Sequence, residues 1–366
     1  MLEGIRVMEI GQVLAAPYAA CILGDLGAEV IKIEKPQGGD EGRRMGPAYR
    51  GQDSMQFIEV NRNKHSVVLD FKTPEGSEQL HALLATADIL VHNLRPGIAE
   101  ECGLDAQTLS ARYPKLIYCE ISGFGDRGPL SQLGGFEPTA QAFSGLISVN
   151  GHPDSPPARV GASVIDYGTA MWIVIGAISA LYRRTQTGKG GVVTGALLET
   201  ALTFVGPHIA AYLNQGREPR RLGTGNPMLV PYQAFAASDG DILIAAGNDR
   251  LFEKLSRALG HPEWPKDERF GLTSQFRRAA VSVPSALAEG HARASTREFA
   301  HYVSIALGSL AELETQLFIS VRLGFTSEEE CDRLLARADE IGKMLRGLQK
   351  ALVNKVSTQP RSRPRP

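Results

Sequence analysis

Asp166 is the residue of this sequence with the clearest capacity for chemistry. It lies at the expected start of an apolar helix over residues 162–184, just after a loop rich in Pro, Gly, Asp and Ser. A carboxylate in that position either caps the helix or acts as a nucleophile toward an activated acyl group. The residue pattern alone favours the cap and leaves both interpretations open.

Other catalytic signatures are missing from the sequence. There is no serine nucleophile elbow, no H-E-x-x-H motif and no P-loop. We expect no metal site, because potential ligands do not cluster. The cysteines are scattered without a C-x-x-C pair, as is typical of free thiols in a reducing cytosol: Cys21, Cys102, Cys119 and Cys331.

Composition sets limits on the partners. The chain has 366 residues, 43% of them hydrophobic, and a formal net charge of −1, so we expect a globular protein of several domains without a nucleic-acid partner. The charged residues Glu3 and Arg6 lie within the first six residues, unlike a signal peptide, which has a basic region followed by an apolar core. The most apolar stretch, near residues 171–181, is too short to span a bilayer. These features predict a cytoplasmic protein that does not enter a membrane.

The elements that would position Asp166 alternate between strand and helix. Strands are expected at residues 5–10, 29–33, 66–69, 89–91 and 116–121, with helices at 17–26 and 74–86. The alternation predicts an α/β fold: a Rossmann-like parallel sheet with helices on both faces. The first turn has a single glycine, Gly11, where a dinucleotide site needs G-x-G-x-x-G, so this pattern disfavours NAD binding.

The last quarter of the chain predicts an α-helical, bundle-like region. Apolar residues recur every three or four positions over 299–317 and 334–352. Gly324 is expected to end the first of these helices, and Thr326 with Glu329 to form the capping box of the second. We therefore divide the chain into a large domain (1–215), a link with a partial small domain and a hairpin at 232–246 (216–263), a four-helix-bundle-like segment (264–353) and a disordered basic tail (354–366).

Several motifs resemble the class III CoA-transferases, the CaiB/BaiF family, in their order and spacing. The resemblance covers residues 1 to about 263, and the motifs are residues 2–7, 16–17, 26–34, 61–64 with 69–70, 93–97, 122–125 and 187–190. It implies that CoA passes from an acyl-CoA to a free carboxylic acid through an aspartyl anhydride and an aspartyl-CoA thioester. Asp166 then matches the catalytic aspartate, and Glu137 an acidic residue near it. Gly223 and Gly225 match a mobile loop over the substrate, and relatives of this kind imply a homodimer.

The same resemblance implies which residues contact CoA. Main-chain groups would hold the pantetheine and adenine, and lysines the phosphates. The implied contacts are Leu14, Ala15, Lys35, Leu69, Asp70, Phe71, Lys72, Asn93, Leu94 and Arg95. Glu101 departs from the family, because relatives usually have an arginine there, and a carboxylate would repel a phosphate.

Two alternatives stay open. Racemases of the same family carry a histidine base where this chain has Phe136, so α-proton exchange is the weaker interpretation. Residues from about 269 to 352 resemble the four-helix-bundle proteins of ribosomal-RNA intervening sequences. The second alternative is therefore an inactive transferase fold fused to a helical association module.

Overall fold

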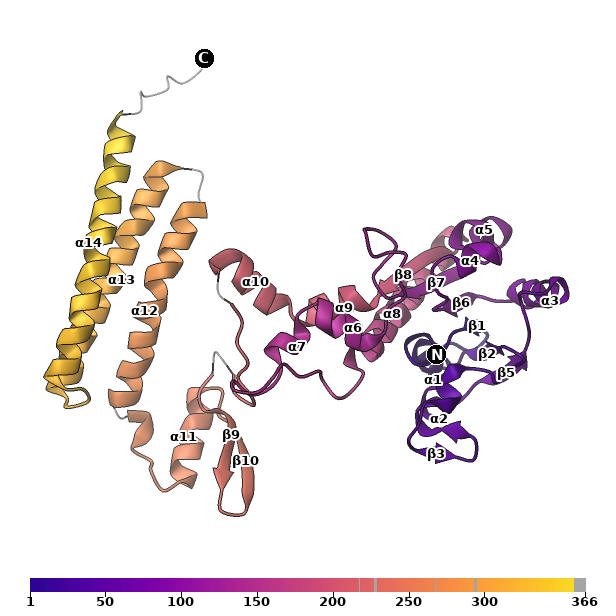
Figure 1. Ribbon diagram of the computed structural model, residues 1–366, viewed down its shortest axis with the longest axis horizontal. Coiled ribbons are helices and arrows are strands. Elements are labelled where there is room, and N and C mark those ends of the chain that lie inside the picture. Colours follow the sequence, from indigo (N-terminus) through magenta and orange to yellow (C-terminus); the bar gives the residue numbers. More distant parts are fainter. Residues whose placement is uncertain (217, 227–228, 267, 293–294, 359–366) are drawn as a thin grey trace. The chain divides into compact units, whose positions relative to one another are not determined.

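The computed structural model describes residues 1–216, 218–226, 229–266, 268–292 and 295–358, in two compact units (Figure 1). The first unit comprises Met1–Ile209 and Pro219–Gly223, and the second Ala210–Glu218 and the chain from Thr224 onward. The finer division at residue 263 stays a prediction.

The first unit is built on a six-stranded parallel sheet, which confirms the predicted Rossmann-like fold. Its strand order is β5-β2-β1-β6-β7-β8. Val7 lies opposite Val30 on one side and Ile89 on the other. The strands are β1 (Arg6–Ile10), β2 (Glu29–Glu34), β5 (His65–Val68), β6 (Ile89–His92), β7 (Ile117–Ser122) and β8 (Gly191–Ala196). The order reverses between β1 and β6, which is where ligands bind in sheets of this kind.

Helices cover both faces of the sheet, and alternate strand residues point to different helices. Val7 and Val91 join the core under α1 (Ala15–Asp25) and α8 (Val164–Thr187). Met8 and Leu90 join the opposite core, under α3 (Pro74–Leu84) and α5 (Ala106–Arg112). Both faces are therefore apolar, as expected of a buried parallel sheet.

Several short elements between the strands were not predicted. They are η1 (Glu41–Arg44), β3 (Tyr49–Arg50), β4 (Asp53–Ser54), α2 (Met55–Val60), α4 (Ile98–Glu101), α6 (Glu137–Phe143), α7 (Leu146–Val149), α9 (Leu197–Phe204) and α10 (Gly206–Gln215). Local capping explains two helix starts: Ser54 accepts a hydrogen bond from the Phe57 amide, and Thr73 caps α3 just before Pro74.

Helix α8 corrects one argument from the sequence. With 24 residues it is long and apolar enough to cross a membrane, so the expectation that its apolar stretch is too short was wrong. One of its faces is nevertheless part of the sheet's core, through Ile165, Ile173 and Ala177. Other large apolar residues of α8, such as Met171, Trp172 and Ile175, are exposed, so only part of the helix belongs to the core.

The second unit contains a hairpin and a group of long helices. The predicted hairpin is confirmed as β9 (Tyr232–Ala237) and β10 (Gly240–Ala245), and α11 (Asp249–Ala258) and η2 (Trp264–Lys266) follow. Helices α12 (Glu268–Ala292), α13 (Thr296–Arg322) and α14 (Glu328–Thr358) share an apolar core that includes Val283, Val303, Leu310 and Leu345. Most residues of the two predicted apolar stripes therefore face neighbouring helices, whereas Leu334 and Ile341 are exposed.

Two details at the ends of α14 differ from the prediction. Ser327, not Thr326, caps the helix: its hydroxyl accepts from the Glu330 amide at 3.2 Å, so the cap lies one residue later than predicted. Gly324 does adopt the left-handed conformation after α13. The predicted disordered tail starts too early, because α14 continues to Thr358, and residues 359–366 lie outside the described residues.

Candidate active site

The segments implied to contact CoA all follow the carboxyl ends of neighbouring parallel strands. Leu14 and Ala15 lie after the turn that follows β1, Lys35 follows β2, residues 69–72 follow β5 and residues 93–95 follow β6. Because parallel strands end at the same edge, the fold gathers these segments along one rim of the sheet, on both sides of the point where the strand order reverses.

The turn between β1 and α1 is fastened to the end of β6. The Asn93 carboxamide accepts from the Gln12 amide and donates to the Gln12 carbonyl, each at 2.9 Å. The Val13 amide donates to the carboxylate of Asp40, also at 2.9 Å. The side chains of Leu14 and Ala15 are buried, so this turn offers mainly its main chain to a ligand.

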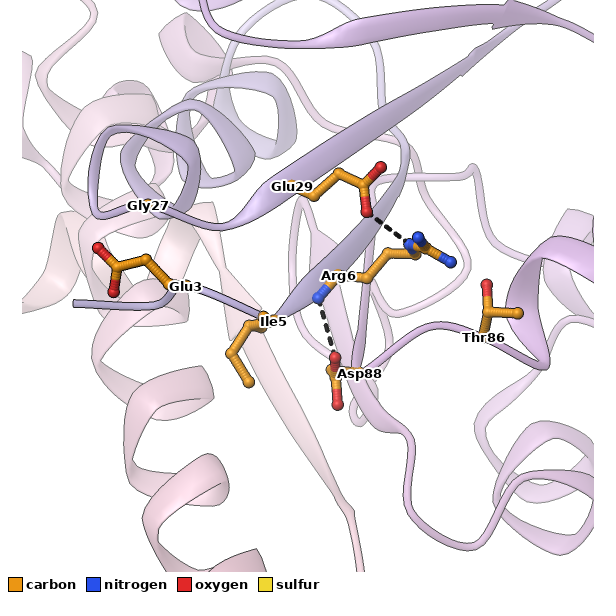
Figure 2. A pocket seen from close by; sticks show the side chains of 8 residues that line it. Glu3, Ile5, Arg6, Gly27, Glu29, Thr86 and Asp88 are labelled. Atoms are coloured by element: carbon orange, nitrogen blue, oxygen red, sulfur yellow. Dashed lines mark hydrogen bonds and ion pairs between the residues drawn. The ribbon is translucent and has the colours of Figure 1, made fainter.

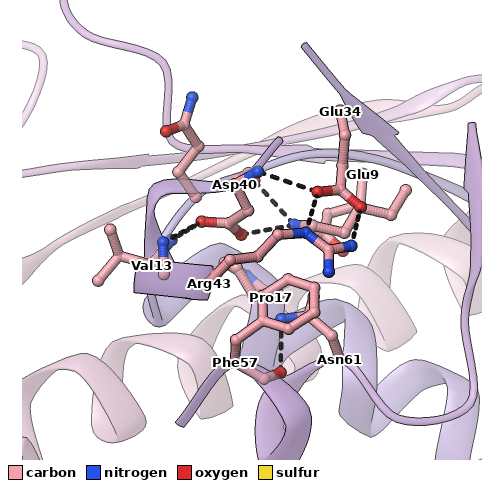
Figure 3. Close-up of polar contacts among 12 residues, drawn as sticks. Glu9, Val13, Pro17, Glu34, Asp40, Arg43, Phe57 and Asn61 are labelled. Carbon is pink, nitrogen blue, oxygen red and sulfur yellow. Dashed lines mark hydrogen bonds and ion pairs between the residues drawn. The ribbon is translucent and has the colours of Figure 1, made fainter. Parts of the chain in front are cut away.

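A buried group of four charges lies directly beneath the turn (Figure 3). Glu9 binds Lys32 at 2.6 Å and Lys64 at 2.8 Å, and Lys32 also binds Asp40 at 2.9 Å. Burial lowers the pKa of Lys32, but Glu9 and Asp40 outweigh it, so the pKa is raised overall. Two carboxylates and two ammonium groups balance in charge, as buried ions must.

A second ion pair holds the loop that carries Asp40. The Arg43 guanidinium forms a bidentate ion pair with the Glu34 carboxylate, with N–O distances of 2.7 and 2.8 Å, and lies over the Phe57 ring. Burial raises the pKa of Glu34, but hydrogen bonds from Arg43, the Asp40 amide and Ser66 lower it to about 2. The loop between β2 and η1 is therefore tied to the sheet.

Asp166 lies in the first turn of α8, and its carboxylate makes no hydrogen bond to any other described residue. The capping interpretation therefore fails, since Ser163 occupies the N-cap position without a side-chain bond. Burial, and secondly the charge of Glu137, raise the pKa of Asp166 to about 7. Such a carboxylate is available for reaction, and burial weakens its hydration.

Glu137 begins α6 and is almost fully buried. Its carboxylate accepts from the Gln141 carboxamide and pairs with Arg159 at 3.4 Å. The fold thus brings Glu137 close enough to Asp166 to affect its pKa, as the family resemblance implies. Phe136, at the position of the racemase histidine, is exposed and has no titratable group.

Aromatic packing links the start of α8 to the start of α1. Tyr167 packs edge-on against Tyr18, with ring centroids 4.7 Å apart. Asp166 precedes Tyr167, and Tyr18 lies one turn beyond Leu14, whose carbonyl accepts from the Tyr18 amide. The first turn of α8, which carries Asp166, is therefore packed against the first turn of α1.

The remaining implied contacts lie on the rim without forming a built site. Lys35 is exposed and pairs with Glu41 at 3.4 Å, while Lys72 and Arg95 are exposed. Leu69 is buried, Phe71 packs on the sheet's core, and Leu94 also contacts that core. Asp70 accepts from the Lys72 amide and stabilises the bend into α3. Glu101 ends α4 with its side chain exposed.

The glycine-rich segment divides between the two units. Gly223 has a φ of +61° and donates to the Gly151 carbonyl at 2.9 Å; a Cβ there would lie 2.7 Å from the His152 ring. Only glycine fits that contact without a shift. Gly225 belongs to the second unit.

A pocket of about 500 Å³ lies at the opposite, amino edge of the sheet (Figure 2). Arg6 and Glu29 on its wall bind each other at 2.7 Å, and Asp88 accepts from the Arg6 amide at 2.8 Å. These polar groups already satisfy one another, so the pocket has no evident chemical role.

Comparison with known proteins identifies the family. The profile of CoA-transferase family III matches residues 2–312, so the chain belongs to this family. A succinyl-CoA:glutarate CoA-transferase of Mus musculus is 38% identical and covers 78% of this chain and 66% of its own length. A succinate–glutarate CoA-transferase of Agrobacterium fabrum is also 38% identical, covering 74% and 69%. A crystal structure of a CaiB/BaiF family protein from Brucella suis is 39% identical with a TM-score of 0.66, covering 74% and 72%.

The extent of these matches changes one expectation. The family profile continues to residue 312, beyond the predicted limit near residue 263, so that limit was wrong. The resemblance of residues 269–352 to intervening-sequence proteins gains no support from these comparisons. The chain spans about two thirds of the length of the curated relatives, at 66% and 69%.

Sequence reasoning missed the charges beneath the turn. Glu9 and Lys32 lie within apolar strands. Their positions could have predicted a buried ion pair, because a charge inside a buried parallel strand needs a partner. Asp40 gave no such signal, since it follows a polar, glycine-containing loop.

Proposed function

We propose that this chain moves CoA from an acyl-CoA to a free carboxylic acid, with Asp166 as the nucleophile. The observation that carries the proposal is the state of the Asp166 carboxylate, which is partly buried and has no hydrogen-bond partner among the described residues. Its neighbour Tyr167 packs against Tyr18 of α1, the helix that follows the turn where the family resemblance expects CoA. Weak hydration makes a carboxylate a better nucleophile toward a thioester.

The reaction proceeds by four acyl transfers. An Asp166 oxygen attacks the thioester carbonyl, the C–S bond breaks, and CoA leaves as thiolate. The thiolate attacks the aspartyl carbonyl of the mixed anhydride, releases the donor acid as carboxylate and leaves an aspartyl-CoA thioester. The acceptor carboxylate attacks this thioester and expels the thiolate. The thiolate then attacks the acceptor's acyl carbonyl, which forms the new acyl-CoA and restores Asp166.

The other residues bind or protect these intermediates. CoA lies along the rim at residues 14–15, 35, 69–72 and 93–95, and is the carrier in the reaction. Burial and then the charge of Glu137 keep the pKa of Asp166 high. The family resemblance assigns Gly223 and Gly225 to a mobile loop that would protect the intermediates from water. The names of both relatives contain glutarate, and they contain succinyl-CoA in one case and succinate in the other, so dicarboxylic acids are the first acceptors to test.

The wider assignment has three parts. The protein acts in the cytosol. It forms a homodimer, and this part of the proposal is supported by an exposed apolar stripe on α8: Met171, Trp172, Ile175, Ile178 and Tyr182. Helices α12–α14 pack through their own apolar core and contribute no catalytic group. Their kinship with the intervening-sequence bundles is part of this proposal.

Labelled glutarate with succinyl-CoA tests the function. The parent protein should form labelled glutaryl-CoA, and Asp166→Asn should form none while remaining folded, because an amide cannot give the anhydride. Hydroxylamine should trap an aspartyl hydroxamate in the parent only. Transfer by Asp166→Asn would exclude Asp166 as the nucleophile. No transfer by the parent with a panel of acids would favour the inactive fold, and deuterium uptake at the α-carbon without transfer would favour the racemase.

A further inference from the structure

The main chain of three consecutive residues after β1 is held by side chains instead of by regular secondary structure. The Gly11 carbonyl accepts from Lys32 at 2.9 Å. Asn93 binds both the amide and the carbonyl of Gln12, and Asp40 accepts from the Val13 amide. The three side chains come from β2, from the loop after it and from the end of β6. They converge on the turn from both sides of the point where the strand order reverses.

We call the contacts of Lys32, Asp40 and Asn93 with residues 11–13 the clasp. The clasp holds an unusual backbone conformation. Val13 has a φ of +71°, in the left-handed region that β-branched residues avoid. Such a conformation persists only where its surroundings over-determine it, and it often marks a functional site. Dinucleotide-binding folds place glycines in the corresponding turn. In this chain, side-chain contacts take the place of the missing glycine.

Asp40 is the best-anchored part of the clasp (Figure 3). Its carboxylate is buried, accepts from the Val13 and Gly42 amides at 2.9 and 2.8 Å, and pairs with Lys32. Its own amide donates to Glu34 at 2.9 Å, and Glu34 is fixed by Arg43. A continuous set of bonds therefore runs from the sheet through Asp40 to the Val13 amide.

We propose that Asp40 is a positioning residue for the binding of CoA. Asp40 holds Val13 in the left-handed conformation and thereby orients the start of α1. The conformation of Val13 sets the direction in which the chain enters α1, and so the directions of the Leu14 and Ala15 main-chain groups. The first amides of a helix have no partner within the helix and are free to meet a ligand. This inference rests on the proposed function, because it takes CoA as the ligand of this turn.

Calorimetric binding of CoA to two variants of Asp40 tests the proposal. Asp40→Asn and Asp40→Ala both remove the charge beside Lys32, but only Asp40→Asn keeps an oxygen for the Val13 amide. We expect Asp40→Ala to raise the Kd for CoA about tenfold or more, and Asp40→Asn to raise it less than about threefold. Equal Kd values for the parent and Asp40→Ala would overturn the proposal.

Val13→Gly separates a positioning role from a structural one. Glycine adopts a φ of +71° without strain. In the Val13→Gly background, the effect of Asp40→Ala on the Kd should therefore shrink to less than about threefold, while its effect on thermal stability persists. In turnover assays, Asp40→Ala should raise the KM for acyl-CoA and leave kcat nearly unchanged. A tenfold loss of affinity that persists beside Val13→Gly would contradict the proposal.

Misfolding of Asp40→Ala and a lack of CoA binding by the parent protein would each have a different meaning. If Asp40→Ala does not fold, Lys32→Met/Asp40→Ala replaces it, because Glu9 keeps Lys64 and the buried charges balance. If that variant also fails to fold, Asp40 is a folding element and the proposal is wrong. A parent protein that binds no CoA would refute the proposed function itself, whereas unchanged affinity in the variants refutes only the role of Asp40.

Discussion

The carboxamide of Asn93 forms two hydrogen bonds to the main chain of Gln12, 81 residues earlier in the chain, each 2.9 Å long. One bond uses the amide nitrogen as donor and the other the side-chain oxygen as acceptor. The contact joins the ends of β1 and β6, where the strand order reverses. The contact therefore requires both the oxygen and the NH₂ group of the Asn93 carboxamide.

Asn93→Asp should weaken CoA binding about tenfold, because a carboxylate oxygen would face the Gln12 carbonyl and leave this carbonyl without a hydrogen-bond donor. A buried acceptor without a donor costs about 1–3 kcal/mol. Isothermal titration with CoA measures the effect. Asn150→Asp is the control, since Asn150 donates to the Ala158 carbonyl in an exposed loop. Equal losses in both variants would show that the Asn93 contact has no particular role in binding.

The sequence predicted the elements of this site better than their connections. The strand at β1, the helix at α1 and the start of α3 at residue 74 follow from local patterns of apolar residues and caps, which act over a few residues. The contacts of Lys32 and Asn93 depend on strand order, which no local pattern contains. Ser327 was missed for a different reason, because Thr326 and Ser327 are both good caps and only the geometry distinguishes them.

Transfer should depend on pH through Asp166. Its pKa is raised to about 7, and only the ionised carboxylate attacks, so kcat/KM should rise with pH up to about that value and then level off. Glu137→Gln removes the second cause of the raised pKa, so the rise should move to lower pH. The exposed carboxylate of Glu199 provides the control, Glu199→Gln, which should leave the profile in place. A profile unmoved by Glu137→Gln would exclude electrostatic coupling of the two carboxylates.

The same raised pKa predicts that Asp166 destabilises the fold at neutral pH. Between the unfolded pKa near 3.8 and the folded value of about 7, the folded state binds the proton more tightly, so stability falls as pH rises. The cost above pH 7 is at most about 4 kcal/mol, at about 1.4 kcal/mol per pKa unit. Asp166→Asn removes this cost. Its advantage in urea unfolding should be large at pH 8 and small at pH 4.5, whereas Asp154→Asn in an exposed loop should give none.

Glu101→Arg should tighten CoA binding about fivefold or more, if residue 101 faces a phosphate as the family resemblance implies, since a charge-assisted hydrogen bond contributes about 1 kcal/mol or more. Glu100→Arg is a matched control, because Glu100 is also exposed on α4 and the change in net charge is identical. Calorimetry on both variants separates a local contact from general attraction. Equal gains would mean that residue 101 does not touch CoA.

Leu313→Asp should destabilise the helical region of the second unit. Leu313 packs against the core formed by α12, α13 and α14, where an unpaired charge costs about 2 kcal/mol or more. Ala311→Asp on the exposed side of the same helix is the control, and it should unfold at nearly the parent's urea concentration. If the helices contribute no catalytic group, the folded fraction of Leu313→Asp should keep the parent's kcat for CoA transfer. A kcat that falls in folded Leu313→Asp, but not in Ala311→Asp, would show that this core also shapes the active site.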